Sequence, residues 1–228
     1  MVDMHKILNF LIELENNNNR EWFHEHKKER QEATKEFENL IQELIFEIGK
    51  FDDSVLLNNP KDLTFKLVRD TRFSHDKSPY NPCFRAHISS RGKLPIPVGY
   101  FISIQPHDAT MLGGGLFADM FKDATEMVRD YIVEHGKELE SIVQDNSFTK
   151  HFKLLGNQLK NVPKGYDVDH PQSDYLKYKS WFVETFIDDK VFLDEKEFMK
   201  ISIQKFKAMK SFNDYLNKAL IDFQMPER

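Results

Sequence analysis

Cysteine and long apolar runs are both scarce in this sequence. The one cysteine, Cys83, has no second cysteine with which to pair, so a fold held by internal disulfides is excluded. No segment approaches the roughly 18 consecutive apolar residues of a membrane-spanning helix. The N-terminal stretch MVDMHKILNF lacks the basic and apolar regions of a signal peptide. We therefore expect a soluble protein of a reducing compartment, the cytoplasm, with no membrane partner.

A surplus of positive charge is also lacking. Lysine and arginine number 32 against 37 aspartates and glutamates, a net charge of -5. Proteins that bind nucleic acids in general carry a basic excess, so the balance argues against that class. The phosphate-binding patterns GxxxxGK[ST] and GxGxxG are absent as well, which argues against the common nucleotide-binding folds.

Apolar residues at spacings of three and four predict helices towards both ends of the chain. A first helix is expected over residues 4–15. A second, long helix would start at a capping box made by Asn18 and Glu21 and end at Gly49. A further helix is expected near residues 119–135, where Gly136 could end it, followed by more helix to about residue 155 and a short helix before residue 180.

The C-terminal region contains two more capping signals. Asp194 with Glu197 three residues later predicts the start of a helix that reaches about Lys210. Ser211 or Asp214 could then cap a separate last helix. Residues 194–228 could therefore form a small helical subdomain.

The middle of the chain has the alternating pattern of strands. In FRAHISS, Phe84, Ala86 and Ile88 fall on one face, and Arg85 and His87 on the other. Loops rather than helices join most of these runs, which favours antiparallel pairing. Strands are expected over 62–69, 84–90, 98–105 and 180–187. The predicted fold class is α+β, a central and mainly antiparallel sheet flanked by N-terminal and C-terminal helices in one domain over 1–228.

The stretch VRDTRFSHDKSPY, residues 68–80, is the most concentrated group of charges in a predicted loop. Arg69 and Arg72 carry planar donor groups suited to phosphate or carboxylate, Lys77 adds a point charge, and Tyr80 can donate a hydroxyl. These groups predict a site for an anion. The alternative is that neighbouring aspartates neutralise the cations within the loop, as a structural network.

Other segments could add to such a site. Arg85 lies on a strand face, Gly114 lies in the run GGG, and Lys164 lies in PKGY. Consecutive glycines can direct backbone amides at a phosphate, although we favour a tight turn or bulge where chains pass closely. The DVDH segment, residues 167–170, holds potential metal ligands, but its spacing is more typical of turns. We expect no metal and no cofactor, and we assign no catalytic residue.

Four segments resemble one known family. RDTRFSHDKSPYNP is similar to the hallmark of a bacterial and fungal family of conserved proteins known only as a domain of unknown function. NNREWF, GYFISIQP with GGGLF, and LKNVPKGYDVDHP resemble that family in the same order. His75 and Asn81 stand where many relatives have lysine. The resemblance implies a mixed α/β fold and supplies no activity.

Three functions remain open. The first is binding of a small phosphorylated or carboxylated ligand, with or without catalysis, by the residues Arg69, Arg72, Lys77, Tyr80, Arg85, Gly114 and Lys164. The second is a non-catalytic module whose charged loop docks an acidic partner protein. The third, disfavoured by the acidic total, is association with nucleic acid. A concave pocket would favour the first, and pairing of the loop cations within the fold would weaken all three.

Overall fold

An antiparallel sheet lies at the centre of the protein. The computed structural model describes residues 1–72, 74–117 and 121–226, and within them the sheet has four strands in the order of the chain. All neighbours pair antiparallel. The strands are β1 (Phe84–Ile88), β2 (Tyr100–Ile104), β3 (Thr110–Leu116) and β4 (Trp181–Ile187). The α+β fold predicted from the sequence is confirmed.

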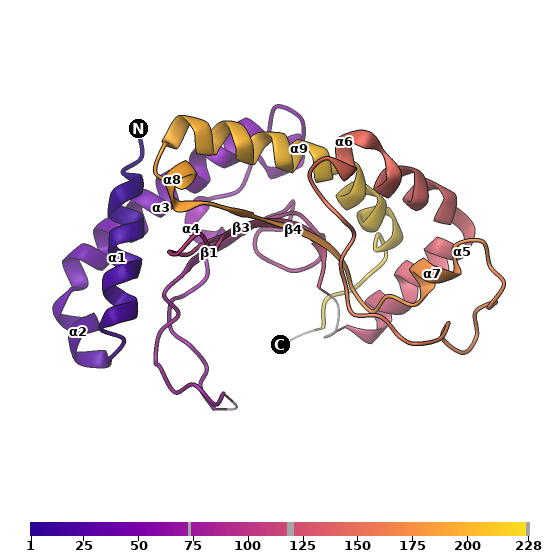
Figure 1. The fold of residues 1–228 in the computed structure, drawn as a ribbon, viewed down its shortest axis with the longest axis horizontal. Helices are drawn as coiled ribbons and strands as arrows, with labels where there is room; N and C mark the ends of the chain where they lie inside the picture. Colours follow the sequence, from indigo (N-terminus) through magenta and orange to yellow (C-terminus); the bar gives the residue numbers. More distant parts are fainter. Residues whose placement is uncertain (73, 118–120, 227–228) are drawn as a thin grey trace.

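Helices surround this sheet on one face and at both ends (Figure 1). Before the sheet come α1 (Met4–Asn16), α2 (Arg20–Glu25), α3 (Lys27–Ile48), the short 3-10 helix η1 (Asp53–Val55) and α4 (Pro60–Leu63). Between β3 and β4 come α5 (Lys122–Gln144), α6 (Asn146–Thr149) and α7 (Ser173–Leu176), and after β4 come α8 (Asp189–Phe192) and α9 (Glu195–Ala219). Helices α1 and α2 lie at one end, and α5 to α7 lie at the other.

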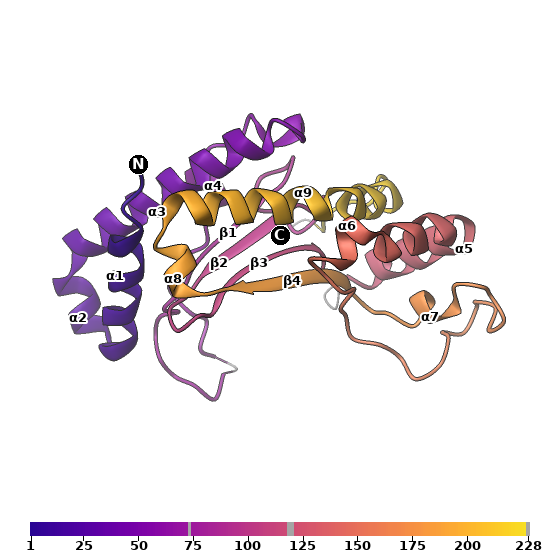
Figure 2. The ribbon, with the colours of Figure 1, turned by 45° about the horizontal axis from the view of Figure 1, so that its top comes forward.

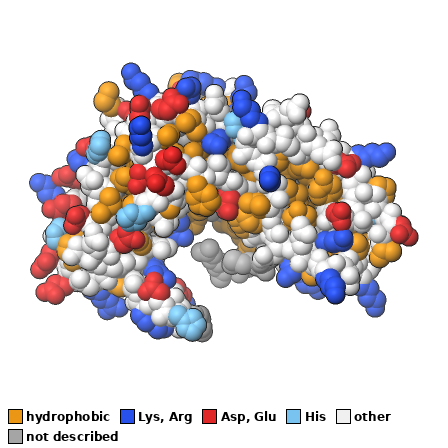
Figure 3. Space-filling model, viewed as in Figure 1, with side chains coloured by type: hydrophobic (Ala, Val, Ile, Leu, Met, Phe, Trp, Pro, Cys, Tyr) orange, Lys and Arg blue, Asp and Glu red, His pale blue; other side chains and the backbone are white. Residues whose placement is uncertain are grey.

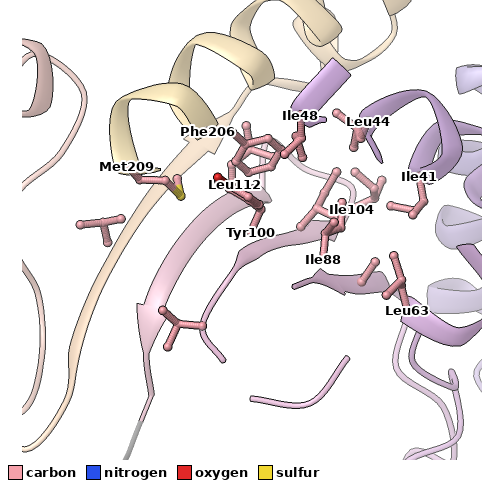
Figure 4. Packing of buried hydrophobic residues seen from close by; sticks show 14 of the residues in the cluster. Ile41, Leu44, Ile48, Leu63, Ile88, Tyr100, Ile104, Leu112, Phe206 and Met209 are labelled. Carbon is pink, nitrogen blue, oxygen red and sulfur yellow. The ribbon is translucent and has the colours of Figure 1, made fainter. Parts of the chain in front are cut away.

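The hydrophobic core lies between the sheet and the pair α3 and α9. Alternation in β1 and β2 turns Ile88, Tyr100 and Ile104 to this side, where all three are buried. Phe206 of α9 and Ile48 of α3 face them (Figure 4). Burial of such side chains is the main source of the folding free energy.

The predicted second helix is divided in two. His26 has a non-helical backbone and separates α2 from α3, and Asn19, rather than Asn18, caps α2 through a bond from the Trp22 amide of 3.0 Å. Asn18 is used elsewhere, because its side-chain amide exchanges two hydrogen bonds with the backbone of Tyr80, at 2.9 and 3.1 Å. The capping-box prediction for Asn18 is therefore wrong.

Residues 62–69 do not form the predicted strand. Asn59 caps the short helix α4, and Pro60 occupies its first turn, so the helix continues to Leu63. Only isolated bridges follow, at Thr64 and Val68. Local helix-start signals outweigh the short alternating pattern here.

Helix α9 is one continuous helix to Ala219. Asp194 caps it through a bond from the Glu197 amide of 3.1 Å, as predicted. The predicted break near Ser211 is wrong, because Asp214 forms an ion pair with Lys210 within the helix, at 2.6 Å. The organisation as a single domain stays a prediction.

Helix α5 runs on past its predicted end. His135 has non-helical angles and kinks the helix, which then continues to Gln144. Asp119 and Met120, with which we expected this helix to begin, lie outside the described residues. Within the described part of the chain, no helix is both long and apolar enough to cross a membrane.

Candidate functional site

The described part of the charged loop, residues 68–72 and 74–80, forms an arm that extends from the sheet beside α1 and α2 (Figures 1 and 2). Its cations are engaged within the arm. Arg69 forms an ion pair with Asp76, and Arg72 holds Asp70 through two nitrogens, with Nε to Oδ1 at 2.9 Å and Nη2 to Oδ2 at 2.6 Å. The geometry is therefore that of the structural network.

Further bonds complete this network. Asp76 also accepts from the Ser78 amide and hydroxyl, at 2.8 and 2.6 Å, and Lys77 donates to the carbonyl of Thr71 at 3.0 Å. Hydrogen bonds from Arg72 lower the pKa of Asp70 to about 2. The bonds from Ser78 and Arg69 hold the pKa of Asp76 well below its usual range. Both carboxylates thus stay charged, and stay paired, throughout the neutral range.

Tyr80 anchors the base of the arm. Its ring is buried and stacks on Phe23, with centroids 3.6 Å apart, and its backbone is held by Asn18. Packing of the ring against Phe23 therefore accounts for a tyrosine at this position of the motif.

Arg69→Ala should loosen the arm without unfolding the protein. Asp76 loses the cation with which it pairs, so the arm amides, including that of Ser78, should exchange faster with deuterated solvent. The free energy of unfolding should change by less than about 0.5 kcal/mol. The control is Arg91→Ala, which removes another arginine with an exposed side chain. Unchanged exchange in the arm would contradict the prediction.

The three glycines lie inside β3. All three pair with β4, and Gly113 and Gly114 also pair with β2. At Gly114 a Cβ would lie 2.6 Å from the Met209 sulfur of α9, and at Gly113 it would lie 2.8 Å from the Val183 carbonyl oxygen. The glycines therefore let chains pass closely, as we favoured from the sequence, but they do so within a paired strand and not in the tight turn or bulge that we expected. Their sheet pairing leaves no cradle of converging amides for an anion.

Lys164 lies far from the arm. It is exposed and belongs to the loop before α7, and that loop lies at the opposite end of the molecule from the arm in both views (Figures 1 and 2). In the DVDH segment, Asp167 accepts from the Asp169 amide at 3.0 Å and His170 contacts the Val133 carbonyl at 3.1 Å. The first bond makes a turn and the second ties the segment to α5. No group of three potential metal ligands occurs among the described residues. The arm, the glycines and this loop do not form one site.

The sheet face turned away from α9, here called the open face, carries polar and aromatic side chains. Strand register places His87 opposite Phe101, and Arg85 opposite Ser103. On this side the surface is hollowed next to the arm (Figure 3). The alternation that buried Phe84, Ala86 and Ile88 thus turns Arg85 and His87 towards this face.

A pocket of about 510 Å³ lies over this face, a volume typical of small-molecule sites. We call it the sheet pocket. Three aromatic rings line it, from Phe65, Phe101 and Phe117, together with Lys66, His87 and Lys93, the segment 94–95 and the backbone of three glycines. Lys66 and Lys93 are exposed, and no carboxylate lines the pocket among the described residues.

His87 is neutral within this pocket at physiological pH. Only 8% of its surface is exposed. Burial lowers its pKa to about 4, against a small opposing effect of the backbone at Leu94 and Lys93. The neutral ring has one donor nitrogen and one acceptor nitrogen.

The buried His87 should make stability depend on pH. Its pKa is near 6.5 in the unfolded chain and about 4 in the fold, so the unfolded chain binds the proton more readily between these values. Stability is fully present above pH 6.5 and should fall by up to about 3 kcal/mol as pH falls to about 4. Urea unfolding of wild type and His87→Gln across this range should show a shallower decline in the variant. Parallel curves would contradict the prediction.

Arg85 differs from the arm arginines because no carboxylate among the described residues pairs with it. It is half-buried and lies over the Phe65 ring, with Cζ 5.5 Å from the centroid. Its Nε is buried without a hydrogen bond, and no ion pair or hydrogen bond to this side chain occurs within the described residues.

Burial raises the pKa of the nearby Cys83 thiol, so that thiol is not an activated nucleophile.

Most of the residues that form the sheet pocket were not predicted from the sequence. Arg85 and His87 could be predicted to share a face, since side chains in a strand alternate. The same alternation in YFISI places Phe101 on that face and was a usable signal. Phe65, Lys93 and Phe117 come from three separate connections, and no local pattern links them.

The sheet, the helices on one face and the pocket on the other define an α+β protein with a cavity of ligand size. The chain belongs to the family described as conserved hypothetical protein (DUF2461), whose model matches residues 6–215. The resemblance to a family of unknown function is confirmed, and the description names no activity. No curated protein and no solved structure matches the chain.

Proposed function

We propose that the protein binds a small ligand with an anionic group and an apolar, flat body in the sheet pocket. Arg85, Lys66 and Lys93 receive the anion, and the rings of Phe65 and Phe101 pack against the body. The observation that carries the proposal is Arg85, a half-buried cation with a buried, unbonded Nε. Arg85 does not itself line the sheet pocket, but it lies over Phe65, a lining ring of this pocket without lining carboxylates.

An unsatisfied arginine of this kind is uncommon. Buried polar groups almost always have a hydrogen-bond partner, and an unsatisfied one costs about 1–3 kcal/mol. A carboxylate or phosphate on the ligand would supply that partner with charge-assisted bonds. The arm is the weaker candidate, because an anion or an acidic partner there would first have to break the pairs made by Arg69 and Arg72.

Cytoplasmic placement belongs to the same proposal. The single Cys83 is buried as a free thiol, which suits a reducing compartment.

Ligand screening on wild type and Arg85→Met tests the proposal. Aromatic carboxylates, aryl phosphates and nucleotides, each with a neutral analogue, would be screened by thermal shift, and hits measured by calorimetry. A ligand at 100 times its Kd stabilises by about 2.7 kcal/mol, which is readily seen. We expect an anionic hit whose affinity falls about 30-fold in Arg85→Met, the equivalent of about 2 kcal/mol.

The unliganded Arg85→Met variant should be as stable as wild type or more so, because methionine removes the unbonded Nε and keeps the contact with Phe65. Arg72→Met is the matched control, since that arginine pairs with Asp70 in the arm, and it should retain wild-type affinity. An anionic ligand that binds equally well to Arg85→Met, or the absence of any anionic hit, would count against the sheet pocket.

A further inference from the structure

A second pocket lies where α1, α2 and α3 meet, apart from the sheet pocket. Its volume is about 410 Å³, and we call it the helical pocket. Each of the three helices contributes lining residues, with Phe10 from α1, Trp22 from α2 and Glu29 from α3 among them. A space of this size holds a small organic molecule.

Aromatic rings form one wall of the helical pocket. Trp22 stacks on His26 with ring centroids 4.2 Å apart, and on Phe10 at 6.1 Å. The ring of His26 is held by a bond of 2.9 Å between Nδ1 and the Trp22 carbonyl. The break between α2 and α3 at His26 places this ring against the indole. The wall is therefore aromatic and fixed by its own contacts.

Acidic groups dominate the rest of the lining. Four carboxylates and one lysine line the helical pocket. The carboxylate of Glu32 is neutralised by Lys6 at 3.3 Å, and Asp3 caps α1 through the Lys6 amide at 2.9 Å. Glu13 and Glu29 make no side-chain hydrogen bond or ion pair with any described residue. Two uncompensated carboxylates, one on α1 and one on α3, thus border a single aromatic cavity.

We propose that the helical pocket binds a small organic cation, a substituted ammonium or guanidinium. Glu13 and Glu29 take its charge, and its carbon skeleton lies against Trp22 and Phe10. Single exposed glutamates on helices are ordinarily solvated and need no ligand. Here both line one cavity whose wall is aromatic, and this combination supplies charge and apolar surface to the same molecule. Its charge preference is opposite to that of the sheet pocket, so the two proposals stand or fall separately.

Tryptophan fluorescence gives a local readout for this site. The chain has two tryptophans. Trp181 is fully buried beside the sheet, whereas Trp22 is partly exposed in the helical pocket. Titration with benzylammonium should therefore change the emission of Trp22. Benzyl alcohol and benzoate are neutral and anionic controls of similar size and should give no saturable change.

The decisive comparison uses two double variants with the same change in net charge. Glu13→Gln with Glu29→Gln removes both pocket charges and should weaken benzylammonium binding at least tenfold. Glu21→Gln with Glu25→Gln removes two exposed charges of α2 that do not line the pocket, and should leave affinity within about twofold. Circular dichroism would establish that both variants are folded.

Three results would overturn the proposal. The first is no saturable change in wild type up to roughly 10 mM benzylammonium. The second is an equal response to benzyl alcohol, which would show that charge is not recognised. The third is equal weakening in the two double variants, which would assign the effect to overall charge rather than to Glu13 and Glu29.

Discussion

Gly115→Ala should destabilise the protein by about 3–5 kcal/mol, which is much of the stability of an ordinary domain. Gly115 has φ of 96°, a conformation that side chains with a Cβ rarely adopt. An added Cβ would lie 2.4 Å from the Trp181 carbonyl oxygen, 2.8 Å from the Phe182 Cα and 2.9 Å from the Phe212 ring. Two of these atoms are backbone of β4, so relief would require β3 and β4 to separate.

A second glycine distinguishes the cost of backbone strain from the cost of steric contacts made by an added Cβ. Gly165 has φ of 103°, yet a Cβ there would meet no atom within 4 Å. Gly165→Ala should therefore cost only the backbone strain, about 1–2 kcal/mol. Urea unfolding of both variants gives the difference directly. Equal losses would show that strand packing at Gly115 is not what excludes a side chain.

The strands that could be predicted from sequence are those in which residues of the two faces alternate clearly along the chain. In β1 and β2 the alternation of Phe84 with Arg85, and of Tyr100 with Phe101, corresponds to the two faces observed, because one face is buried against α3 and α9. Helix α1 could likewise be predicted from its apolar stripe. These elements owe their form to a pattern that local sequence contains.

The errors arose where a local signal competed with another or with distant contacts. Asn59 and Pro60 start a helix inside a segment that alternates. Asn18 has the residue type of a cap but bonds to Tyr80, 62 positions away. A contact between positions so far apart leaves no periodic pattern in the sequence. The continuity of α9 past Ser211 likewise reflects its packing over the sheet, which overrides a cap-forming residue type.

The candidate site was predictable only in part for the same reason. Arg69, Arg72 and Arg85 have the same chemistry, and composition does not distinguish them. The loop conformation decides that Arg69 meets Asp76, seven residues on, while the strand register sets Arg85 opposite Ser103, a residue without charge. Sequence could therefore identify arginines as candidates, but the availability of each depends on tertiary neighbours.

Phe206→Ala should cost about 3–5 kcal/mol, the usual loss for a fully buried phenylalanine. Phe206 has no exposed surface, and its ring meets that of Tyr100 edge to face, with centroids 5.3 Å apart. It lies between α9 and the sheet, near Ile48 of α3 (Figure 4). Truncation would leave a cavity at the junction of three elements, and rigid neighbours on each side would limit collapse.

Phe186→Ala is the matched control, because it removes the same atoms from a side chain that is 60% exposed. Its effect should stay within about 0.5 kcal/mol. The difference between the two variants, measured by urea unfolding with unchanged m-values, reports the burial of Phe206 and the cavity that its loss leaves. A small difference would mean that α9 is not held against Tyr100 as the structure shows. A large one would establish that α9 packs tightly against the face bearing Tyr100, opposite the face that carries Arg85 and His87.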